Sequence, residues 1–343
     1  MGTGPLQPSD RQASRPRSLC GPVKEHRMLS KAELGLRYAW NLFEMVRRQR
    51  GLADAARIES QFVLGELTKT PRALRWYAGA RNGSSTTDGK IPVMHSERLV
   101  QELRAVLPLQ DYQIDVPAYR KHLATAGYPL SYAAGPAARH GGREQKVSEY
   151  FVTFDILDFR FGDIVLDVAS EWSIFPLVAE RLTGAAVYRL DLIYPAGHHG
   201  RWIGASAAEM PLQAGSVDKI VLHNAFEHFE GDADARFLRE AHRVLKPGGQ
   251  LLIVPLFMSE KHAIVTDPFV RTGAIAWDRG ANVVRLPWWH NRFGRFYSPR
   301  ALQERVLKHA EGFSVQGYHF VNPKEIDEEV ILHFGVLFTK QGG

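Results

Sequence analysis

The chain has 343 residues, of which 45% are hydrophobic and 23% are charged, and this composition excludes a fibrous or wholly disordered protein. A single cysteine, Cys20, excludes an internal disulfide framework and any metal site built from several cysteines. The formal net charge is +6, and residues 1–90 hold 16 Lys and Arg against 8 Asp and Glu. Basic charge at one end, without an RNA-binding motif, disfavours nucleic acid as a partner.

The sequence contains no apolar run of the roughly eighteen residues that a membrane-spanning helix needs. Its first residues also lack the apolar core and the small cleavage-site residues of a secretory signal. We therefore expect a cytoplasmic protein without a membrane span. The sequence leaves the oligomeric state open.

The first part of the chain differs from the rest in composition and in its apolar pattern. Residues 1–27 are rich in Pro, Gly, Ser and Arg and have no apolar period, so they predict a disordered tail. Residues 28–145 predict a mainly helical accessory region. It has two helices between residues 29 and 67, with a break at Gly51, and a further helix over 96–107.

Residues 146–343 predict a different architecture, a doubly wound, mostly parallel α/β sheet of seven strands. The last two strands are joined by a short segment without a helix, which predicts an antiparallel C-terminal hairpin at the sheet edge. In chain order we expect a helix at 144–157, a strand at 163–169, a helix at 174–184, strands at 186–192 and 219–224, a helix at 232–246, a strand at 250–257, a helix at 298–310, and strands at 313–321 and 328–340.

A long connection at about 257–298 shows no clear regular structure in its sequence and predicts a lid-like insertion that binds an acceptor. Its aromatic and basic side chains suit stacking on a sugar or a planar ring. They are Trp277, Trp288, Trp289, His290, Arg292, Arg295, Phe296 and Tyr297. The alternative for each tryptophan is a structural role, in which it packs the loop against the rest of the domain. The adjacent His198 and His199 lack a third ligand, so no metal site is predicted.

Two carboxylates end the first two predicted strands of the sheet. Ligands of open α/β sheets bind beyond the carboxyl ends of the strands, which places Asp167 and Asp191 at a candidate site. An acid in the position of Asp191 can accept hydrogen bonds from both ribose hydroxyls of an adenine nucleoside. The alternative for Asp191 is a turn or helix-capping aspartate.

The stretch IGASAAEMPLQAGSVDKIVLHNAFEHFEGDADARFLREAHRVLKPGGQLLIVPL, at 203–256, resembles the central and later motifs of class I S-adenosylmethionine-dependent methyltransferases of type 11. The resemblance covers about 146–256 in sequence and 297–340 in topology only. It implies a Rossmann-like fold, S-adenosylmethionine as cofactor, and methyl transfer to a small-molecule or glycan acceptor, with a hydroxyl as the methylated group.

The resemblance also implies residue roles. Asp167 would lie near the methionine moiety of the cofactor, Asp191 would bind the ribose, and the Ser206-Ala207 pair would flank the adenine. Asn224, which follows the fourth strand of the family, would face the sulfonium.

The candidate catalytic residues are Glu227 and His228, which border the acceptor in the resemblance, and His290 in the insertion. A hydroxyl acceptor needs a base, and His228 or His290 can supply it. The alternative for His228 is a packing or helix-capping imidazole.

The loop after Asp167 departs from the family pattern, because all three of its glycine positions hold other residues in the run ASEWS, 169–173. Ala169 and Glu171 stand at the first two positions and are expected to line the cofactor. S-adenosylmethionine has no phosphate to cradle, so the change counts more heavily against a dinucleotide than against this cofactor.

Two other interpretations stay open. A catalytically degenerate methyltransferase fold could act as a binding or regulatory subunit, and the basic N-terminal region could recruit a partner.

Overall fold

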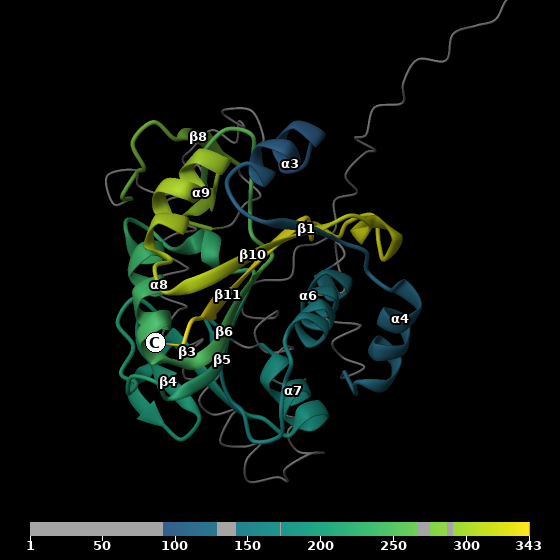
Figure 1. Cartoon of the computed structure of the whole chain (residues 1–343), viewed down its shortest axis with the longest axis vertical. Coiled ribbons are helices and arrows are strands. Elements are labelled where there is room, and N and C mark those ends of the chain that lie inside the picture. Colours follow the sequence, from purple (N-terminus) through teal and green to yellow (C-terminus); the bar gives the residue numbers. More distant parts are fainter. Residues whose placement is uncertain (1–91, 129–141, 172, 267–274, 287–290, 343) are drawn as a thin grey trace, which may run out of the picture.

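The computed structural model describes residues 92–128, 142–171, 173–266, 275–286 and 291–342. At its centre lies an eight-stranded sheet in the order β1-β10-β11-β6-β5-β2-β3-β4 (Figure 1). The predicted tail at 1–27 and the predicted helices between residues 29 and 67 lie outside the described residues.

The strands of this sheet are β1 (Leu109–Tyr112), β2 (Ile164–Val168), β3 (Ala186–His199), β4 (Trp202–Gly204), β5 (Val217–His223), β6 (Leu245–Val254), β10 (Phe313–Phe320) and β11 (Phe334–Lys340). The helices are α3 (Glu97–Arg104), α4 (Val116–Thr125), α6 (Gly142–Ile156), α7 (Phe175–Thr183), α8 (Ala233–Val244) and α9 (Pro299–Arg305), with short 3-10 turns η2 (Phe226–His228), η4 (Leu307–His309) and η5 (Pro323–Glu325).

The predicted doubly wound class is confirmed. Strand β2 pairs in parallel with β3 and β5, and β5 pairs in parallel with β6. The antiparallel C-terminal pair is confirmed too, since β11 runs antiparallel to both β10 and β6. The sheet has eight strands, where seven were expected and six were located in the sequence. The two that were not located are β1, which pairs in parallel with β10 and takes the edge expected for the hairpin, and β4, which pairs with β3 at the other edge. Four mostly polar residues, LQDY, give too short a pattern to predict a strand.

Helices cover both faces of the sheet (Figure 1). Because side chains alternate along a strand, Leu166 faces the core formed with α3, α8 and α9, while the neighbouring Val165 faces the core formed with α4, α6 and α7. Each fully buried leucine or phenylalanine in these cores contributes about 1.5–3 kcal/mol relative to an exposed one.

The helix starts follow local sequence signals. The Ser96 hydroxyl accepts a hydrogen bond from the Leu99 amide at α3, and Ser298 does the same for the Ala301 amide at α9. Helix α7 ends at Gly184, whose φ of 71° is left-handed and suits glycine.

The insertion is more regular than its sequence predicted. It contains β7 (Ala263–Thr266), β8 (Asn282–Arg285) and β9 (Gly294–Phe296), which form a separate three-stranded sheet in the order β8-β7-β9. The expectation of irregular structure was wrong here. These strands are three or four residues long and pair with segments distant in the sequence, so local periodicity carries no signal for them.

Within the described part of the chain, no helix has both the length and the apolar character needed to cross a bilayer.

Three histidines meet beside the end of β10. The Nε2 atoms of His95 and His319 are 2.9 Å apart, and the rings of His95 and His333 stack with centroids 4.9 Å apart. Burial, and then the neighbouring charges of His95, Lys324 and His319, lower the pKa of His333 from 6.5 to about 4. Burial also lowers the pKa of His95. The cluster therefore favours the neutral rings of His95 and His333.

We expect acid to destabilise the protein through this cluster. Because the folded-state pKa of His333 is below its unfolded value, its contribution is complete above pH 6.5 and is lost as the pH falls toward 4. The loss reaches up to about 3 kcal/mol. Denaturant titrations between about pH 4 and pH 7 measure it. His333→Phe, which keeps a ring but takes no proton, should flatten the profile, and an equally steep profile in this variant would contradict the assignment.

Candidate functional site

The candidate site lies at the carboxyl ends of β2, β3, β4 and β5. These strands are parallel where they pair, with Val168 level with Leu190 and with Leu222, so their ends meet at one edge of the sheet. His290 lies outside the described residues. Asp191 lies inside β3, which continues past its predicted end at residue 192 to His199, and it is level with Gly204 at the end of β4. The other predicted site residues lie on or just after the ends of β2, β4 and β5, and in chain order they are Asp167, Ala169, Glu171, Ser206, Ala207, Asn224, Glu227 and His228.

The loop after β2 keeps a glycine-like backbone without glycine. Ala169 has a φ of 52° and Glu171 a φ of 39°, both in the left-handed region. These are the first two positions at which the resemblance expects glycine. For a residue with a Cβ atom, this left-handed conformation is less favourable by about 1–2 kcal/mol. Other contacts must therefore hold the loop in this conformation.

The side chains of β3 provide those contacts. Asp191 accepts hydrogen bonds from the amides of Glu171 at 2.8 Å and Ile193 at 3.0 Å. The Tyr194 hydroxyl donates to the Glu171 carbonyl and lies 2.9 Å from Ser170 Oγ. Burial raises the pKa of Tyr194, so its phenol stays protonated and remains a donor. Strand β3 therefore fixes the loop from the side.

Ala169→Gly is expected to raise the free energy of unfolding by about 0.5–1 kcal/mol, because glycine relieves the left-handed strain and loses part of that gain to its greater unfolded-state entropy. Urea titration measures the change. Ala124→Gly, at an exposed position of α4, is the matched control and should lower stability. A destabilised Ala169→Gly would show that the methyl group itself holds the loop.

The predicted adenine pair follows β4 beside Asp191. Asp191 lies level with Gly204, and the Ala205 amide donates to the Asp191 carbonyl at 3.3 Å. Ser206 Oγ accepts from the Ala208 amide at 3.2 Å, which tightens the turn. Ser206 and Ala207 are therefore brought next to Asp191.

Asn224 directly follows β5 and has a left-handed conformation with a φ of 52°, which asparagine tolerates better than most residues. Its amide donates to the Val254 carbonyl at 3.2 Å. This turn directs the chain into η2, which carries Glu227 and His228.

His223, the last residue of β5, is a buried polar residue that the sequence pattern did not single out, and it lies under α6. Its Nδ1 is 3.7 Å from Oδ1 of Asp167, which is 1% exposed. The other ring nitrogen of His223, Nε2, lies 3.0 Å from Thr153 Oγ1. Asp167 Oδ2 and His223 Nδ1 have no hydrogen-bond partner among the described residues.

Helix α6 also brings an ion pair to this place. Glu149 is fully buried and accepts a hydrogen bond from Lys146 Nζ at 2.9 Å. Lys146 Nζ lies 3.5 Å from the His223 carbonyl oxygen. The sequence EQKVSEYF contains this charged pair, which could have indicated a buried polar site. The sequence alone does not show which face of the helix is covered.

Glu227 and His228 form a pair at the end of β5. His228 Nδ1 is 2.6 Å from the Phe293 carbonyl, so this nitrogen carries the hydrogen and Nε2 is the basic one. Nε2 lies 3.4 Å from Glu227 Oε1. Burial raises the pKa of Glu227, with partial compensation by the charge of His228. Glu227 Oε2 has no partner among the described residues.

Several side chains predicted to face an acceptor are instead buried or paired with other side chains of the protein. Arg295, Phe296 and Tyr297 are buried, and Arg292 forms an ion pair with Glu230. Trp277 is half-buried. Trp288, Trp289 and His290 lie outside the described residues. The expected acceptor roles of the three buried residues are therefore wrong.

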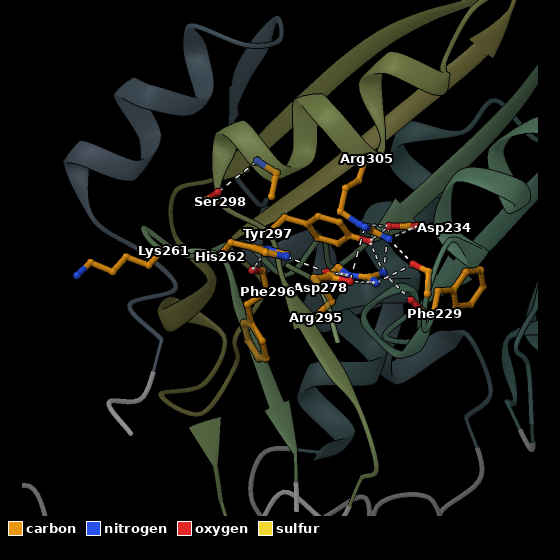
Figure 2. A network of polar contacts seen from close by, with 12 residues as sticks. Phe229, Asp234, Lys261, His262, Asp278, Arg295, Phe296, Tyr297, Ser298 and Arg305 are labelled. Atoms are coloured by element: carbon orange, nitrogen blue, oxygen red, sulfur yellow. Dashed lines mark hydrogen bonds and ion pairs between the residues drawn. The ribbon is translucent and has the colours of Figure 1, made fainter. Parts of the chain in front are cut away.

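Arg295 anchors the insertion to the start of α8 (Figure 2). Its guanidinium binds both carboxylate oxygens of Asp278, at 2.7 and 2.9 Å, and Asp234 Oδ2 at 3.0 Å. Asp234, at the start of α8, also accepts from Tyr297 Oη at 2.9 Å and Arg305 Nε at 3.0 Å. The short sheet is thereby fixed beside η2 and α8.

Residues 173–253 match a family model described as a methyltransferase domain. The match begins at Ser173, the last of the three positions at which the resemblance expects glycine. No match was found among the curated proteins.

Solved structures resemble the chain at low identity. A chain of a Haloferax volcanii complex containing the Trm112 methyltransferase activator is 15% identical, with a TM-score of 0.42, over 62% of this chain and 96% of that one. An S-adenosylmethionine-dependent methyltransferase from Mesorhizobium loti is 17% identical, with a TM-score of 0.39, over 57% and 98%. The 1,6-didemethyltoxoflavin-N1-methyltransferase of Burkholderia thailandensis, with bound S-adenosylhomocysteine, is 14% identical, with a TM-score of 0.39, over 76% and 97%.

The side chains at the strand ends fit S-adenosylmethionine. The unpartnered buried oxygens of Asp167 and Glu227 are suited to a cation, and this cofactor carries a sulfonium and an ammonium. The carboxylate of Asp191 accepts hydrogen bonds from two backbone amides, which hold it beside Ser206 and Ala207, where the resemblance expects the ribose and the adenine. The family match over 173–253 and this site together support a methyltransferase domain of the class I type, with S-adenosylmethionine as its cofactor.

Proposed function

We propose that the protein transfers the methyl group of S-adenosylmethionine to a hydroxyl of a sugar, a glycan or a small metabolite, with His228 as the base. The observation that carries this proposal is the hydrogen bond of His228 Nδ1 to the Phe293 carbonyl, 2.6 Å long. It leaves Nε2 as the nitrogen that can accept a proton. A hydroxyl must lose its proton during methylation, so a base fixed in one tautomer suits this acceptor.

Glu227 is the second member of the proposed machinery. It lies 3.4 Å from His228 Nε2 and is 3% exposed. When the imidazole takes the proton of the acceptor, a carboxylate at this distance stabilises the resulting cation. The cofactor, when bound, supplies an activated methyl group. The protein mainly orients the acceptor oxygen and removes its proton.

A glycan acceptor is favoured by the position of the insertion. Phe293, which fixes His228, belongs to the insertion, so the acceptor side of the site is built partly from 257–298. The half-buried Trp277 lies in the same segment and offers a ring on which a sugar can stack. His290 remains a second candidate base.

The test supplies the full chain with S-adenosylmethionine labelled in its methyl group and two panels of acceptors. One panel holds free, nucleotide-linked and polymeric sugars, and the other holds amines, carboxylic acids and thiols. We expect label on a hydroxyl, as an ether that survives the mild base that hydrolyses methyl esters. Transfer only to nitrogen, carboxylate or sulfur would contradict the proposal. Binding of S-adenosylhomocysteine without turnover on any acceptor would favour the binding or regulatory subunit.

A further inference from the structure

Three side chains of β3 and β4 meet beside the loop that follows β2. They are Arg189, Tyr194 and Trp202, and we call them the loop clamp. The guanidinium carbon of Arg189 lies 4.7 Å from the centre of the Trp202 ring, and the Tyr194 ring stands edge-on to Trp202 at 4.8 Å. A guanidinium over a tryptophan face is attracted to it, and edge-to-face rings attract each other as well. The three side chains therefore hold one another in fixed orientations.

Both polar ends of the loop clamp bind the backbone of that loop. Arg189 Nη1 donates to the Ser173 carbonyl at 2.6 Å, and the Tyr194 hydroxyl donates to the Glu171 carbonyl. A phenol has one hydrogen, so the Ser170 hydroxyl, 2.9 Å away, donates to Tyr194. The loop is thus held at three points from the side of β3.

The position of Tyr194 depends on a glycine in β4. Strand β3 continues past Asp191 and turns back, so that Gly204 lies level with both Asp191 and Ala196. A Cβ atom at Gly204 would come within 1.9 Å of the Pro195 carbonyl oxygen, where no side chain fits. This close approach of two backbones needs glycine, and it brings the Tyr194 hydroxyl to the loop.

The loop needs such contacts because its backbone is strained. Ala169 and Glu171 have φ values of 52° and 39°, which residues with a Cβ atom rarely adopt. Without contacts that offset the strain, the loop relaxes into other conformations. A cofactor then binds only the fraction of molecules in which the loop keeps its shape. A lost contact weakens cofactor binding through the shape of the loop.

We propose that Tyr194 is a positioning residue for the cofactor: with Arg189 and Trp202 it keeps the loop after β2 in the left-handed conformation that receives S-adenosylmethionine. The loop clamp replaces the missing glycines, because it holds by contacts a conformation that glycine adopts freely. The inference rests on the assigned cofactor and deepens it, since it says what keeps the loop able to bind. It does not depend on which acceptor is methylated.

The test is titration calorimetry of the full chain with S-adenosylhomocysteine. Tyr194→Phe keeps the ring against Trp202 and loses two hydrogen bonds to the loop, so we expect binding about tenfold weaker than in wild type. In a protein that already carries Ala169→Gly, the same substitution should weaken binding by no more than about threefold, because glycine reaches the left-handed conformation without help. A purely structural role of Tyr194 would give the same loss in both backgrounds.

A second variant acts on the same loop without touching its hydrogen bonds. Trp202→Phe keeps Arg189 and Tyr194 but removes much of the ring face that orients them. We expect it to weaken binding by about threefold in the wild-type background, and by less in the Ala169→Gly background. Urea titration establishes that each variant is folded under the conditions of the calorimetry.

Tyr112→Phe is the matched control. Its phenol donates to Asp155, and β1 lies at the edge of the sheet, separated from β2 by four strands. This variant loses a phenol hydrogen bond and should bind S-adenosylhomocysteine like wild type. Wild-type affinity in Tyr194→Phe, or an equal loss with and without Ala169→Gly, would overturn the positioning role. No binding by the wild-type protein would overturn the cofactor assignment and this inference with it.

Discussion

Arg295→Met is expected to lower the free energy of unfolding by about 3–5 kcal/mol, because it leaves two buried carboxylates without their main counter-charge. Arg295 and Asp234 are fully buried, and Asp278 has a side-chain exposure of 6%. Although burial raises the pKa of Asp278, hydrogen bonds from His262 and Arg295 outweigh it and hold this pKa well below its usual range. Asp278 is therefore ionised and needs its partner.

Guanidinium chloride titration of the purified protein measures this loss. The matched control is Arg292→Met, three residues earlier, whose ion pair with Glu230 is exposed at 49% of the arginine side chain. Such pairs contribute about 0–1 kcal/mol. Equal effects of the two substitutions would contradict an anchoring role for Arg295. The triple variant Arg295→Met, Asp234→Asn, Asp278→Asn should recover part of the loss, since it removes the unpaired charges as well.

His228→Ala is expected to reduce kcat by about 100- to 10,000-fold on the acceptor found by the labelling test, because the acceptor hydroxyl loses its base. Affinity for S-adenosylhomocysteine should stay within about threefold of wild type, since a base acts on the acceptor and not on the cofactor. Steady-state turnover and calorimetry together measure the two effects.

Free imidazole added to the His228→Ala protein should restore part of the turnover, as it can occupy the space of the lost ring and accept the proton. His309→Ala, in η4 and away from the strand ends, is the control and should turn over like wild type. Full activity in His228→Ala would assign His228 to packing and leave His290 as the candidate base.

The sequence predicted those parts of the fold that depend on local pattern. The alternation of apolar strands with helices from residue 146 predicted the doubly wound sheet, and Ser96, Gly184 and Ser298 marked helix ends. The short strands β1 and β7 were not predicted, because four residues are too few to show a period. Their pairing partners are distant in the sequence.

The site was predictable to the level of strand ends. Asp167 and Asp191 were predicted as site residues because ligands of open α/β sheets bind beyond the carboxyl ends of the strands. The left-handed conformation of Ala169 and Glu171 could not be predicted. It depends on a hydrogen bond from Tyr194, which lies in the part of β3 beyond the predicted strand end. His223 was hidden for a related reason, as its partners Asp167 and Thr153 come from separate elements.

The pairing of β1 with β10 has a consequence for anyone who prepares a shortened protein. An unpaired edge strand presents a row of open amides and carbonyls that other chains can extend, and natural sheets cover such edges. Cutting the chain at residue 145, where the repeating strand and helix pattern begins, would strip β1 from Gly317, Tyr318 and their neighbours. We expect that fragment to aggregate through β10, and a fragment starting before residue 92 to remain dispersed.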